Sequence, residues 1–279
     1  MTEVIKLKQL GLRTGNNFIL KNIDWTIYEG EHWVLFGSNG SGKTTLLSII
    51  AGYQLYTNGE MEVFGEQYDD SNLLSLRKKI GFISSSFFGK YYSRESALDV
   101  VLSGKSSTLG LSYDITSRDV KEAKKLLKAF NLNKIYSHPF NLLSNGERQR
   151  ILVLRALMAK PSVFLFDEPC AGLDAFSYEY MLKFIKLLCV ETKATVIFVT
   201  HRPEEITDEF EKCFLLRNGQ MYSNGDTDNT FTTSKISGFF DYPVRVSKEG
   251  RAFKFNLDVE VPLNDWVQEK MIVDPCLNG

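Results

Sequence analysis

One stretch decides the fold of this chain: Gly37-Ser38-Asn39-Gly40-Ser41-Gly42-Lys43-Thr44. Its glycines let the backbone curl until successive N–H groups point inward. The run before it, His32–Phe36, is short, continuous and apolar, which is typical of a strand buried on both faces. The residues after it, from Thr44 to about Ala51, have a helical pattern. A loop of this kind between a buried strand and a helix is suited to holding phosphate groups.

The residue types in this loop indicate a nucleoside triphosphate. The positive end of the helix dipole faces the anion together with the loop N–H groups. We expect Lys43 to reach the β- and γ-phosphates and the Thr44 hydroxyl to ligate Mg²⁺, and we count Thr45 among the nucleotide-binding residues. The alternative is a glycine-rich turn that binds nothing, which the flanking strand and helix disfavour.

Two carboxylates follow a second apolar strand. Val163–Phe166 leads directly into Asp167 and Glu168. In a parallel α/β sheet, ligands bind at the carboxyl ends of the strands, so Asp167 is expected to emerge beside the phosphate loop and hold Mg²⁺. Glu168 is then placed to polarise the water that attacks the γ-phosphate. An ordinary acidic turn closing a strand is the alternative.

Strands alternate with helices over most of the chain, which predicts an α/β fold with a mainly parallel sheet. The first 35 residues instead resemble half-buried antiparallel strands, and the middle third is helical. We predict strands over residues 4–10, 23–27, 32–36, 80–83, 163–166, 195–200, 213–217 and 252–257. We predict helices over residues 44–51, from 73 up to the strand at 80, and over 96–103, 119–130, 147–158 and 176–192.

Composition and charge exclude several classes of protein. Hydrophobic residues make up 43% of the chain, which is enough for a sizeable core, and no apolar run approaches the roughly 20 residues of a membrane span. The N-terminal residues lack the apolar stretch of a signal peptide. The net charge of −1 disfavours nucleic acid as a partner. The cysteines, Cys170, Cys189, Cys213 and Cys276, form no CxxC pair and are expected to be reduced, as in a cytoplasmic protein.

A cluster of lysines lies on the helix predicted over residues 119–130. Lys121, Lys124, Lys125 and Lys128 resemble a nucleic-acid patch. The other side of the same helix carries apolar residues at helical spacing. We therefore favour the solvated face of an amphipathic helix over a nucleic-acid site.

A capping box begins the helix predicted over 147–158. In Leu143-Ser144-Asn145-Gly146-Glu147, the Ser144 and Glu147 side chains are spaced to satisfy each other's backbone N–H groups. The helix N-terminus also offers a hydroxyl and a glycine amide to a phosphate. A helix cap without further function would be the preferred interpretation if this motif stood alone.

Taken together, these motifs resemble the nucleotide-binding domains of ABC ATPases over roughly residues 4–225. The glycine-rich loop resembles the Walker A motif, Leu143–Glu147 a variant of the LSGGQ signature, and Phe164–Glu168 the Walker B strand with its catalytic glutamate. Ala171-Gly172-Leu173-Asp174 resembles the D-loop, and His201 the switch histidine. The motifs follow one another in the order of that family.

The resemblance implies a P-loop NTPase core with an N-terminal antiparallel part and an inserted helical subdomain. It implies a cassette over residues 1–240, with the subdomain over about 90–160, and a tail of unknown role over 241–279. It also implies a Mg²⁺-dependent ATPase that pairs head to tail with a second cassette around two ATP molecules. Ser144 and Gly146 would then contact the γ-phosphate bound by the partner, Asp174 would lie at the same interface, and His201 would sense the γ-phosphate.

Two positions depart from the family pattern. A glutamine usually follows the strand at residues 80–83 and contacts the Mg²⁺ and its water, whereas this chain has Ser85, which is shorter and has no amide. The family also stacks adenine on an aromatic residue near the N-terminus. Phe18 is the candidate here, with Arg13 as an alternative and a core position for Phe18 as another.

Three functions follow from this interpretation. The first is the ATP-hydrolysing subunit of an ABC transporter, working with separate transmembrane permease subunits at the cytoplasmic face of a membrane. The second, favoured by Ser85, is a soluble ABC ATPase acting in ribosome function, repair or assembly. Motifs such as Thr200–Glu205 resemble a single-cassette branch of molybdenum-transport or photorepair type. The third, a sensor that binds ATP without hydrolysis, is disfavoured by Glu168 and His201.

Overall fold

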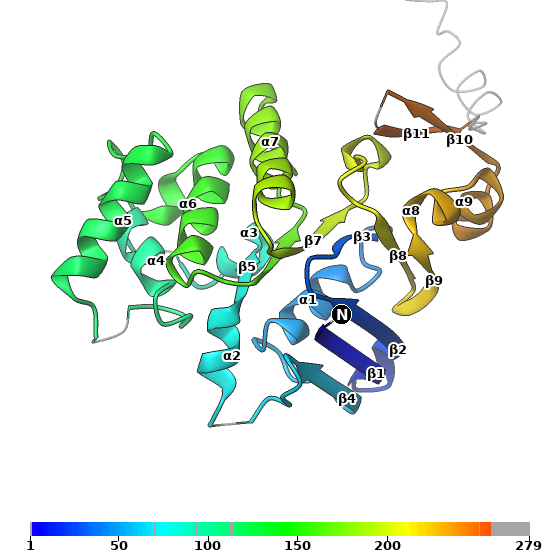
Figure 1. The fold of residues 1–279 in the computed structure, drawn as a ribbon, viewed down its shortest axis with the longest axis horizontal. Coiled ribbons are helices and arrows are strands. Elements are labelled where there is room, and N and C mark those ends of the chain that lie inside the picture. Colours follow the sequence, from blue (N-terminus) through cyan, green and yellow to red (C-terminus); the bar gives the residue numbers. More distant parts are fainter. Residues whose placement is uncertain (1, 70, 93, 112–113, 251, 258–279) are drawn as a thin grey trace, which may run out of the picture.

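The computed structural model describes residues 2–69, 71–92, 94–111, 114–250 and 252–257 (Figure 1). Within them, a sheet of six strands forms the centre of the molecule. In pairing order, these strands are β5 (Ile80–Ile83), β6 (Val163–Asp167), β7 (Thr195–Thr200), β3 (His32–Phe36), β8 (Lys212–Arg217) and β9 (Gln220–Asp226). All neighbouring pairs are parallel except β8 and β9. The predicted mainly parallel α/β fold is therefore confirmed.

The central strands are apolar because both of their faces are covered. Every residue of β6 and β7 is buried. Helix α1 (Lys43–Ile50) packs against β6, and α7 (Ala175–Glu191) packs against β7. Figure 1 shows α7 above the strands and α1 below them. This burial explains why the strands contain continuous apolar runs instead of alternating polar and apolar residues.

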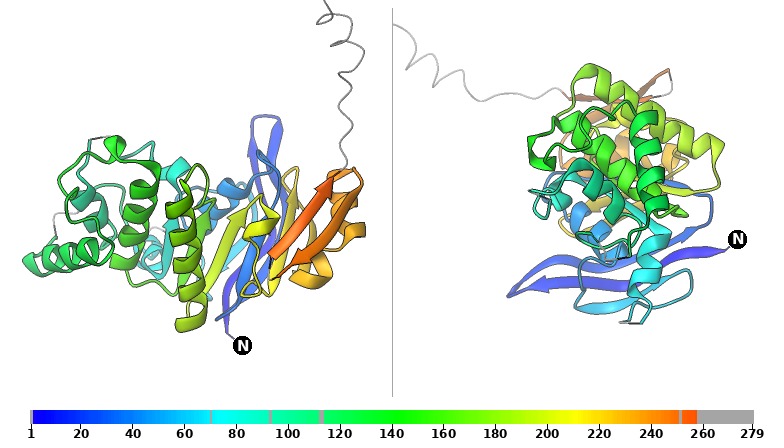
Figure 2. Two further views of the ribbon diagram at one scale, coloured as in Figure 1. Left: turned by 90° about the horizontal axis from the view of Figure 1, so that it is seen from above. Right: turned by 90° about the vertical axis from the view of Figure 1, so that its left-hand side faces the viewer.

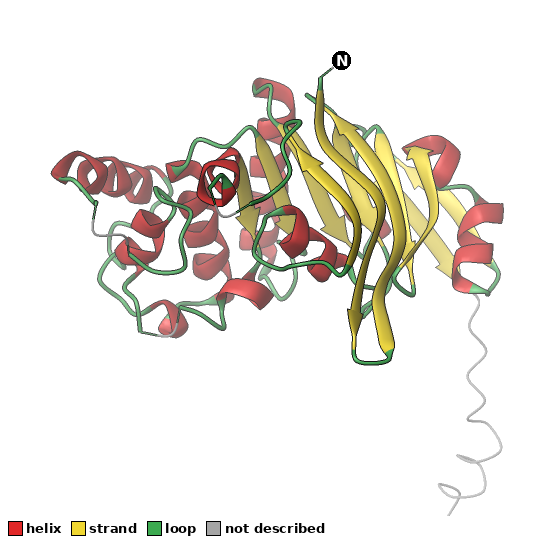
Figure 3. Ribbon diagram, turned by 90° about the horizontal axis from the view of Figure 1, so that it is seen from below, coloured by secondary structure: helices red, strands yellow, loops and turns green. Residues whose placement is uncertain are grey.

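A second, antiparallel sheet is formed by the N-terminal part of the chain. It consists of β1 (Glu3–Thr14) between β2 (Asn17–Tyr28) and β4 (Asn58–Val63), and its two long strands are prominent in Figure 3. Its buried Trp25 packs on Phe214 of the central sheet, with ring centroids 4.6 Å apart. The antiparallel N-terminal part was predicted, but β4 was not.

The middle of the chain is helical, as predicted. Helix α2 (Leu73–Lys79) leads into β5, and the short α3 (Ser85–Phe88) follows it. Helices α4 (Ala97–Ser103), α5 (Ser117–Ala129) and α6 (Asn145–Met158) pack on one another and lie together at one end of the molecule (Figures 1 and 2). Ala123 and Leu127 of α5 are buried and its lysines are exposed, which confirms the amphipathic helix. The limits of the helical subdomain, about 90–160, stay a prediction.

A buried arginine joins the helical part to the part of the chain that contains α1. Arg155 of α6 is 3% exposed, and its hydrogen-bond partners among the described residues are all uncharged. Its guanidinium donates to the Tyr92 and Tyr53 hydroxyls at 2.9 and 3.1 Å and to the Thr108 carbonyl at 3.0 Å. Since Tyr53 lies just after α1, one side chain connects α6 to the end of the helix that begins in the glycine-rich loop.

The C-terminal part contains more structure than the sequence predicted. After α8 (Thr227–Thr230) and α9 (Thr233–Phe240), strands β10 (Val244–Glu249) and β11 (Ala252–Leu257) form a hairpin at the opposite end from α5. The strand predicted over residues 252–257 is confirmed, whereas β10 was not expected. The boundary at residue 240 stays a prediction, and residues 258–279, including Cys276, lie outside the described residues.

Among the described residues, no helix has both the length and the apolar character that crossing a bilayer requires.

Candidate nucleotide site

The glycine-rich loop connects β3 to α1, as predicted. Gly42 precedes the first helical residue with φ of +103°, a backbone conformation that favours glycine. A Cβ added at Gly42 would lie 2.9 Å from Leu20 Cδ2. The position therefore requires glycine for both its backbone conformation and its close packing.

The Lys43 ammonium is buried inside the loop. Its Nζ donates to the carbonyl oxygens of Gly37 and Ser38, both at 2.9 Å. It also lies 3.2 Å from Oε1 of Glu168, and the Lys43 side chain is only 4% exposed. A buried cation is poorly screened by solvent, so an anionic ligand can compete with Glu168 for it.

Asp167 is surrounded by hydroxyl groups from two separate segments. Thr44 Oγ1 donates to Oδ1 of Asp167 at 3.0 Å, and Ser84 Oγ donates to Oδ2 at 2.6 Å. Ser86 Oγ donates to the same Oδ2 at 3.3 Å. Burial raises the pKa of Asp167 above its ordinary value, and the hydrogen bonds from Ser84 and Thr44 act in the opposite direction. The sequence predicted Thr44 beside Asp167 but not Ser84 or Ser86.

Glu168 points back over the loop because its backbone is in the left-handed region. Its φ is +46°, which is uncommon for a residue with a side chain, and its N–H donates to the Val199 carbonyl at 3.1 Å. Oε1 reaches Lys43, and Oε2 lies 3.3 Å from Nδ1 of His201. Strained residues of this kind collect at functional sites. The two residues predicted as catalytic therefore lie side by side.

These groups meet at a cleft of about 560 Å³. It is lined by predicted residues, namely Asn39, Gly40, Gly42, Lys43, Thr44, Thr45, Ser85, Asp167 and Glu168. It is also lined by Ile19, Ser86 and Gln149, which were not predicted, and by Asn145 and Ala171, which belong to the expected signature and D-loop motifs. The cleft thus combines the carboxyl ends of β3 and β6 with one face of α6, as expected for a ligand site in an α/β sheet.

Gln149 was not predicted to line the site, although its helical spacing from Asn145 could have indicated it. Asn145 and Gln149 are four residues apart on α6, so they share a helix face. Gln149 is 3% exposed, and its Oε1 has no hydrogen-bond partner among the described residues. A buried acceptor at the wall of a cleft favours a polar ligand there.

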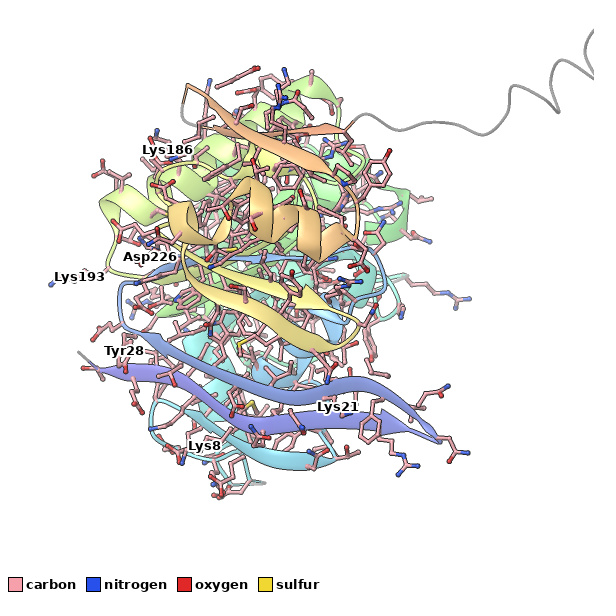
Figure 4. The ribbon with its side chains drawn as sticks, turned by 90° about the vertical axis from the view of Figure 1, so that its right-hand side faces the viewer. Lys8, Lys21, Tyr28, Lys186, Lys193 and Asp226 are labelled. Atoms are coloured by element: carbon pink, nitrogen blue, oxygen red, sulfur yellow. The ribbon has the colours of Figure 1, made fainter. Side chains whose placement is uncertain are left out.

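The surroundings of Ser85 and Phe18 could not be read from the sequence. Ser85 lines the cleft, but the hydroxyls that contact Asp167 belong to its neighbours Ser84 and Ser86. Phe18 is 51% exposed, so the alternative of a core position was wrong. Its ring lies 5.5 Å from the Arg13 guanidinium, while the next residue, Ile19, lines the cleft. Figure 4 shows Lys21, whose ammonium lies 5.9 Å from the Phe18 ring, on the same strand. Adenine stacking on Phe18 stays a prediction.

The predicted site residues Ser144, Gly146 and Asp174 lie close together and outside the lining of the cleft, whereas Asn145 and Ala171 from the same two motifs line it. Ser144 and Glu147 form the expected capping box at the start of α6. Asp174 caps α7 by accepting from the Ser177 N–H at 3.0 Å and its hydroxyl at 2.7 Å, which lowers the pKa of Asp174. Ser177 Oγ in turn lies 2.3 Å from the place of a Cβ on Gly146. This close approach requires glycine at position 146.

The chain is similar to proteins of one family over most of its length. The family model described as "ABC transporter" matches residues 20–171. The uncharacterized ABC transporter ATP-binding protein YlmA of Bacillus subtilis is 37% identical over 246 residues, covering 87% of this chain and 93% of that protein. The molybdate import ATP-binding protein MolC of Haemophilus influenzae is 29% identical, covering 88% and 90%.

Solved structures agree with this similarity. A dimeric ATP-binding cassette in a post-hydrolysis state, bound to ADP and phosphate, superposes with a TM-score of 0.67 at 29% identity. The match covers 80% of this chain and 98% of that cassette.

Proposed function

The chain belongs to the family of ABC transporter ATP-binding proteins, and from this membership we propose that it hydrolyses ATP in the cleft beside Lys43 while paired with a second cassette. The observation that carries the proposal is the meeting of the Lys43 ammonium, the Thr44 hydroxyl and the Asp167 and Glu168 carboxylates at one cleft. These groups cover the needs of phosphoryl transfer, namely charge neutralisation, positioning and a base.

ATP binding requires Lys43 to exchange partners. The ammonium now contacts two carbonyl oxygens and Glu168. The β- and γ-phosphates carry more negative charge than these partners and are cradled by the N–H groups of the loop. Transfer of Lys43 to the phosphates releases Glu168, which is then free to contact water. In this proposal, ATP binding itself prepares the base.

The residues around Asp167 fit Mg²⁺. A carboxylate and a hydroxyl oxygen 3.0 Å apart are the hard oxygen donors that Mg²⁺ prefers, and the ion commonly takes its other ligands from phosphates and water. Asp167 and Thr44 would hold it, with Ser85 at the edge of the cleft as a further candidate. When bound, the ion would neutralise charge on the β- and γ-phosphates.

Glu168 is the proposed general base. Its carboxylate takes a proton from water as the water oxygen bonds to the γ-phosphorus and the bond to the bridging oxygen of ADP breaks. ADP and inorganic phosphate are the products. His201, 3.3 Å from Glu168, orients that carboxylate and contacts the γ-phosphate. Burial of Lys43 keeps its charge from being screened by solvent.

The partner cassette completes each site. We propose that Ser144, Gly146 and Asp174 face the nucleotide of the second subunit, since they lie outside the lining of the cleft in their own chain. Ser144 is exposed, and the N-terminus of α6 offers its dipole to a phosphate. ATP then holds two cassettes together, and hydrolysis releases them.

The family description, ABC transporter, suggests what this cycle of ATP binding and hydrolysis is used for. We propose that the pair works at the cytoplasmic face of a membrane and powers transport through separate permease subunits. Co-purification of the full chain with a protein containing several membrane spans tests this part. Isolation of an active cassette pair bound instead to ribosomes or repair proteins would support the non-transport alternative, which Ser85 at the glutamine position favours.

Replacement of the base tests the hydrolytic step. Glu168→Gln should retain ATP binding, lower the turnover number by about 10²-fold or more, and accumulate an ATP-bound dimer, because the amide cannot accept the proton. Steady-state phosphate release and light scattering with ATP measure these effects. Lys43→Ala is the matched variant, and it should lose ATP binding and dimerisation together. Hydrolysis by Glu168→Gln at the parent rate would refute the assignment of the base.

A further inference from the structure

The C-terminal hairpin lies against the segment that carries His201. Strand β11 packs on the short 3-10 turn η2 (Pro203–Glu205), which begins two residues after His201. Figure 4 shows the hairpin and α9 on the side of β9 that faces away from β1 and β2. The last described part of the chain therefore borders a residue of the proposed catalytic pair.

An aromatic cluster attaches the hairpin to the root of the glycine-rich loop. The Phe255 ring of β11 lies 5.8 Å from Phe36 and 6.0 Å from Phe240, as measured between ring centroids. Phe36 is the last residue of β3, directly before Gly37. Phe253 of the same strand is 5% exposed and packs on Phe231 at 5.0 Å. Contacts of this kind fix the position of the hairpin by shape.

The same cluster reaches His201 through a small cavity of about 220 Å³. His201, Phe36, Phe240 and the first residues of the loop line it. Phe240 ends α9, and its ring packs on Phe255 of the hairpin. A shift of β11 would therefore move Phe240 and so change the cavity that His201 lines.

Backbone hydrogen bonds hold the glycine-rich loop in place, whereas the His201 side chain has few polar contacts. Within the loop, Ser41 N–H donates to Ser38 O at 3.2 Å, and Gly219 N–H donates to Ser41 O at 3.0 Å. The His201 side chain is 38% exposed, and its one polar contact among the described residues is Glu168. The segment that contains His201 and η2 is instead held by the Thr200 hydroxyl, which donates to the buried Glu205 carboxylate at 2.5 Å. A displaced hairpin should thus affect His201 more than the loop.

A lysine adds a second attachment beyond the turn. Lys248 Nζ on β10 lies 2.8 Å from Asp228 and 3.4 Å from Asp208, which follows η2. These ion pairs are largely exposed and contribute little to stability. They nevertheless tie the hairpin to both α8 and the segment after η2.

We propose that the C-terminal hairpin is a positioning element for hydrolysis, in which Phe255, acting through Phe240 and η2, holds His201 against Glu168. This inference rests on the proposed function. Phe255 does not line the proposed nucleotide cleft, so it acts through the histidine. The role belongs to the hydrolytic step and not to ATP binding.

Phe255→Ala in the full-length chain tests the proposal. The turnover number should fall about tenfold while the KM for ATP stays within twofold, because small displacements of a catalytic group reduce the rate strongly. Phe255→Leu should restore most of the rate by refilling the space. Lys254→Ala is the matched control, because Lys254 is exposed on the same strand and should leave the rate unchanged. A normal rate in Phe255→Ala, or a raised KM with a normal turnover number, would overturn the proposal.

Two further measurements separate positioning from loss of structure. His201 ring-proton resonances, identified by their absence in His201→Ala, should move in Phe255→Ala while those of the exposed His138 stay in place. The effect of Phe255→Ala on turnover should also vanish in the His201→Ala background, although its effect on the melting temperature persists. Unmoved His201 resonances would contradict the proposal. Failure of the proposed function is distinguishable, because the parent chain itself would then lack ATP hydrolysis.

Discussion

At the scale of single residues, the site depends on how Asp167 is held. Its two oxygens receive hydroxyl hydrogen bonds from Thr44 on one side and from Ser84 and Ser86 on the other. A hydrogen bond to a charged group contributes about 1.5–3 kcal/mol. The run of serines after β5 therefore orients the carboxylate proposed to hold Mg²⁺.

The three adjacent serines should differ in effect. Ser84→Ala should lower ATP hydrolysis most, about tenfold, because Ser84 is fully buried and has the shorter hydrogen bond. Ser86→Ala should have a smaller effect, and Ser85→Ala the smallest, since Ser85 donates no hydrogen bond to Asp167. Hydrolysis measured over a series of Mg²⁺ concentrations ranks the variants, with the exposed Ser75→Ala as a control. A larger loss in Ser85→Ala than in Ser84→Ala would refute this order.

Much of the site was predictable at this scale because short sequence motifs carry its functional groups. The grouping of Lys43, Thr44, Asp167 and Glu168 follows from the rule that parallel strands end at one edge of a sheet. Ser84 and Gln149 were not predictable in the same way. Their positions depend on the register of β5 beside β6 and on the packing of α6, which a single sequence does not specify.

At the scale of elements, most helices and the buried strands were predictable, including β5 at the edge of the central sheet, whereas the strands β4 and β9 were not. The strand over residues 195–200 was predicted with its observed bounds because its inner residues, Val196–Val199, form a continuous apolar run. In contrast, β4 and β9 lie at sheet edges and are largely exposed, and β9 contains Ser223-Asn224-Gly225-Asp226, which has the composition of a turn. Strand β4 pairs with β1, which is distant in sequence, so the local pattern does not indicate it. Strand β9 pairs with the preceding β8, but its turn-like composition does not indicate a strand.

Helix α6 begins at a residue with two roles that substitution can separate. Ser144→Ala removes the cap and should lower the free energy of unfolding by about 1 kcal/mol. Ser144→Asp keeps a good cap and should leave stability near that of the parent. It nevertheless places a negative charge where the phosphate of the partner is expected, so ATP-driven dimerisation should be lost. Denaturant unfolding and light scattering measure the two effects. Dimerisation of Ser144→Asp at the parent ATP concentration would argue against a signature role for Ser144.

At the scale of the whole molecule, the composite site predicts complementation between inactive chains. A mixed dimer of Lys43→Ala and Ser144→Asp contains one site in which both residues are intact. Mixing the two variants should therefore restore at most about half of the parent activity, since neither variant pairs with itself and each mixed dimer has one intact site of two. ATP hydrolysis by each variant alone and by the mixture is the measurement. Activity that stays absent on mixing would indicate that each chain completes its own site.

The buried Arg155 determines how the two ends of this molecule can move. Its guanidinium donates hydrogen bonds both to the helical part and to Tyr53 after α1. Since the group is buried and its described partners are uncharged, each lost hydrogen bond would leave part of a buried positive charge without a partner. A translation of the helical end along the core would break these hydrogen bonds and is therefore unfavourable. A small rotation about the guanidinium would keep them. Arg155 thus opposes any movement of the helical end that would break these hydrogen bonds.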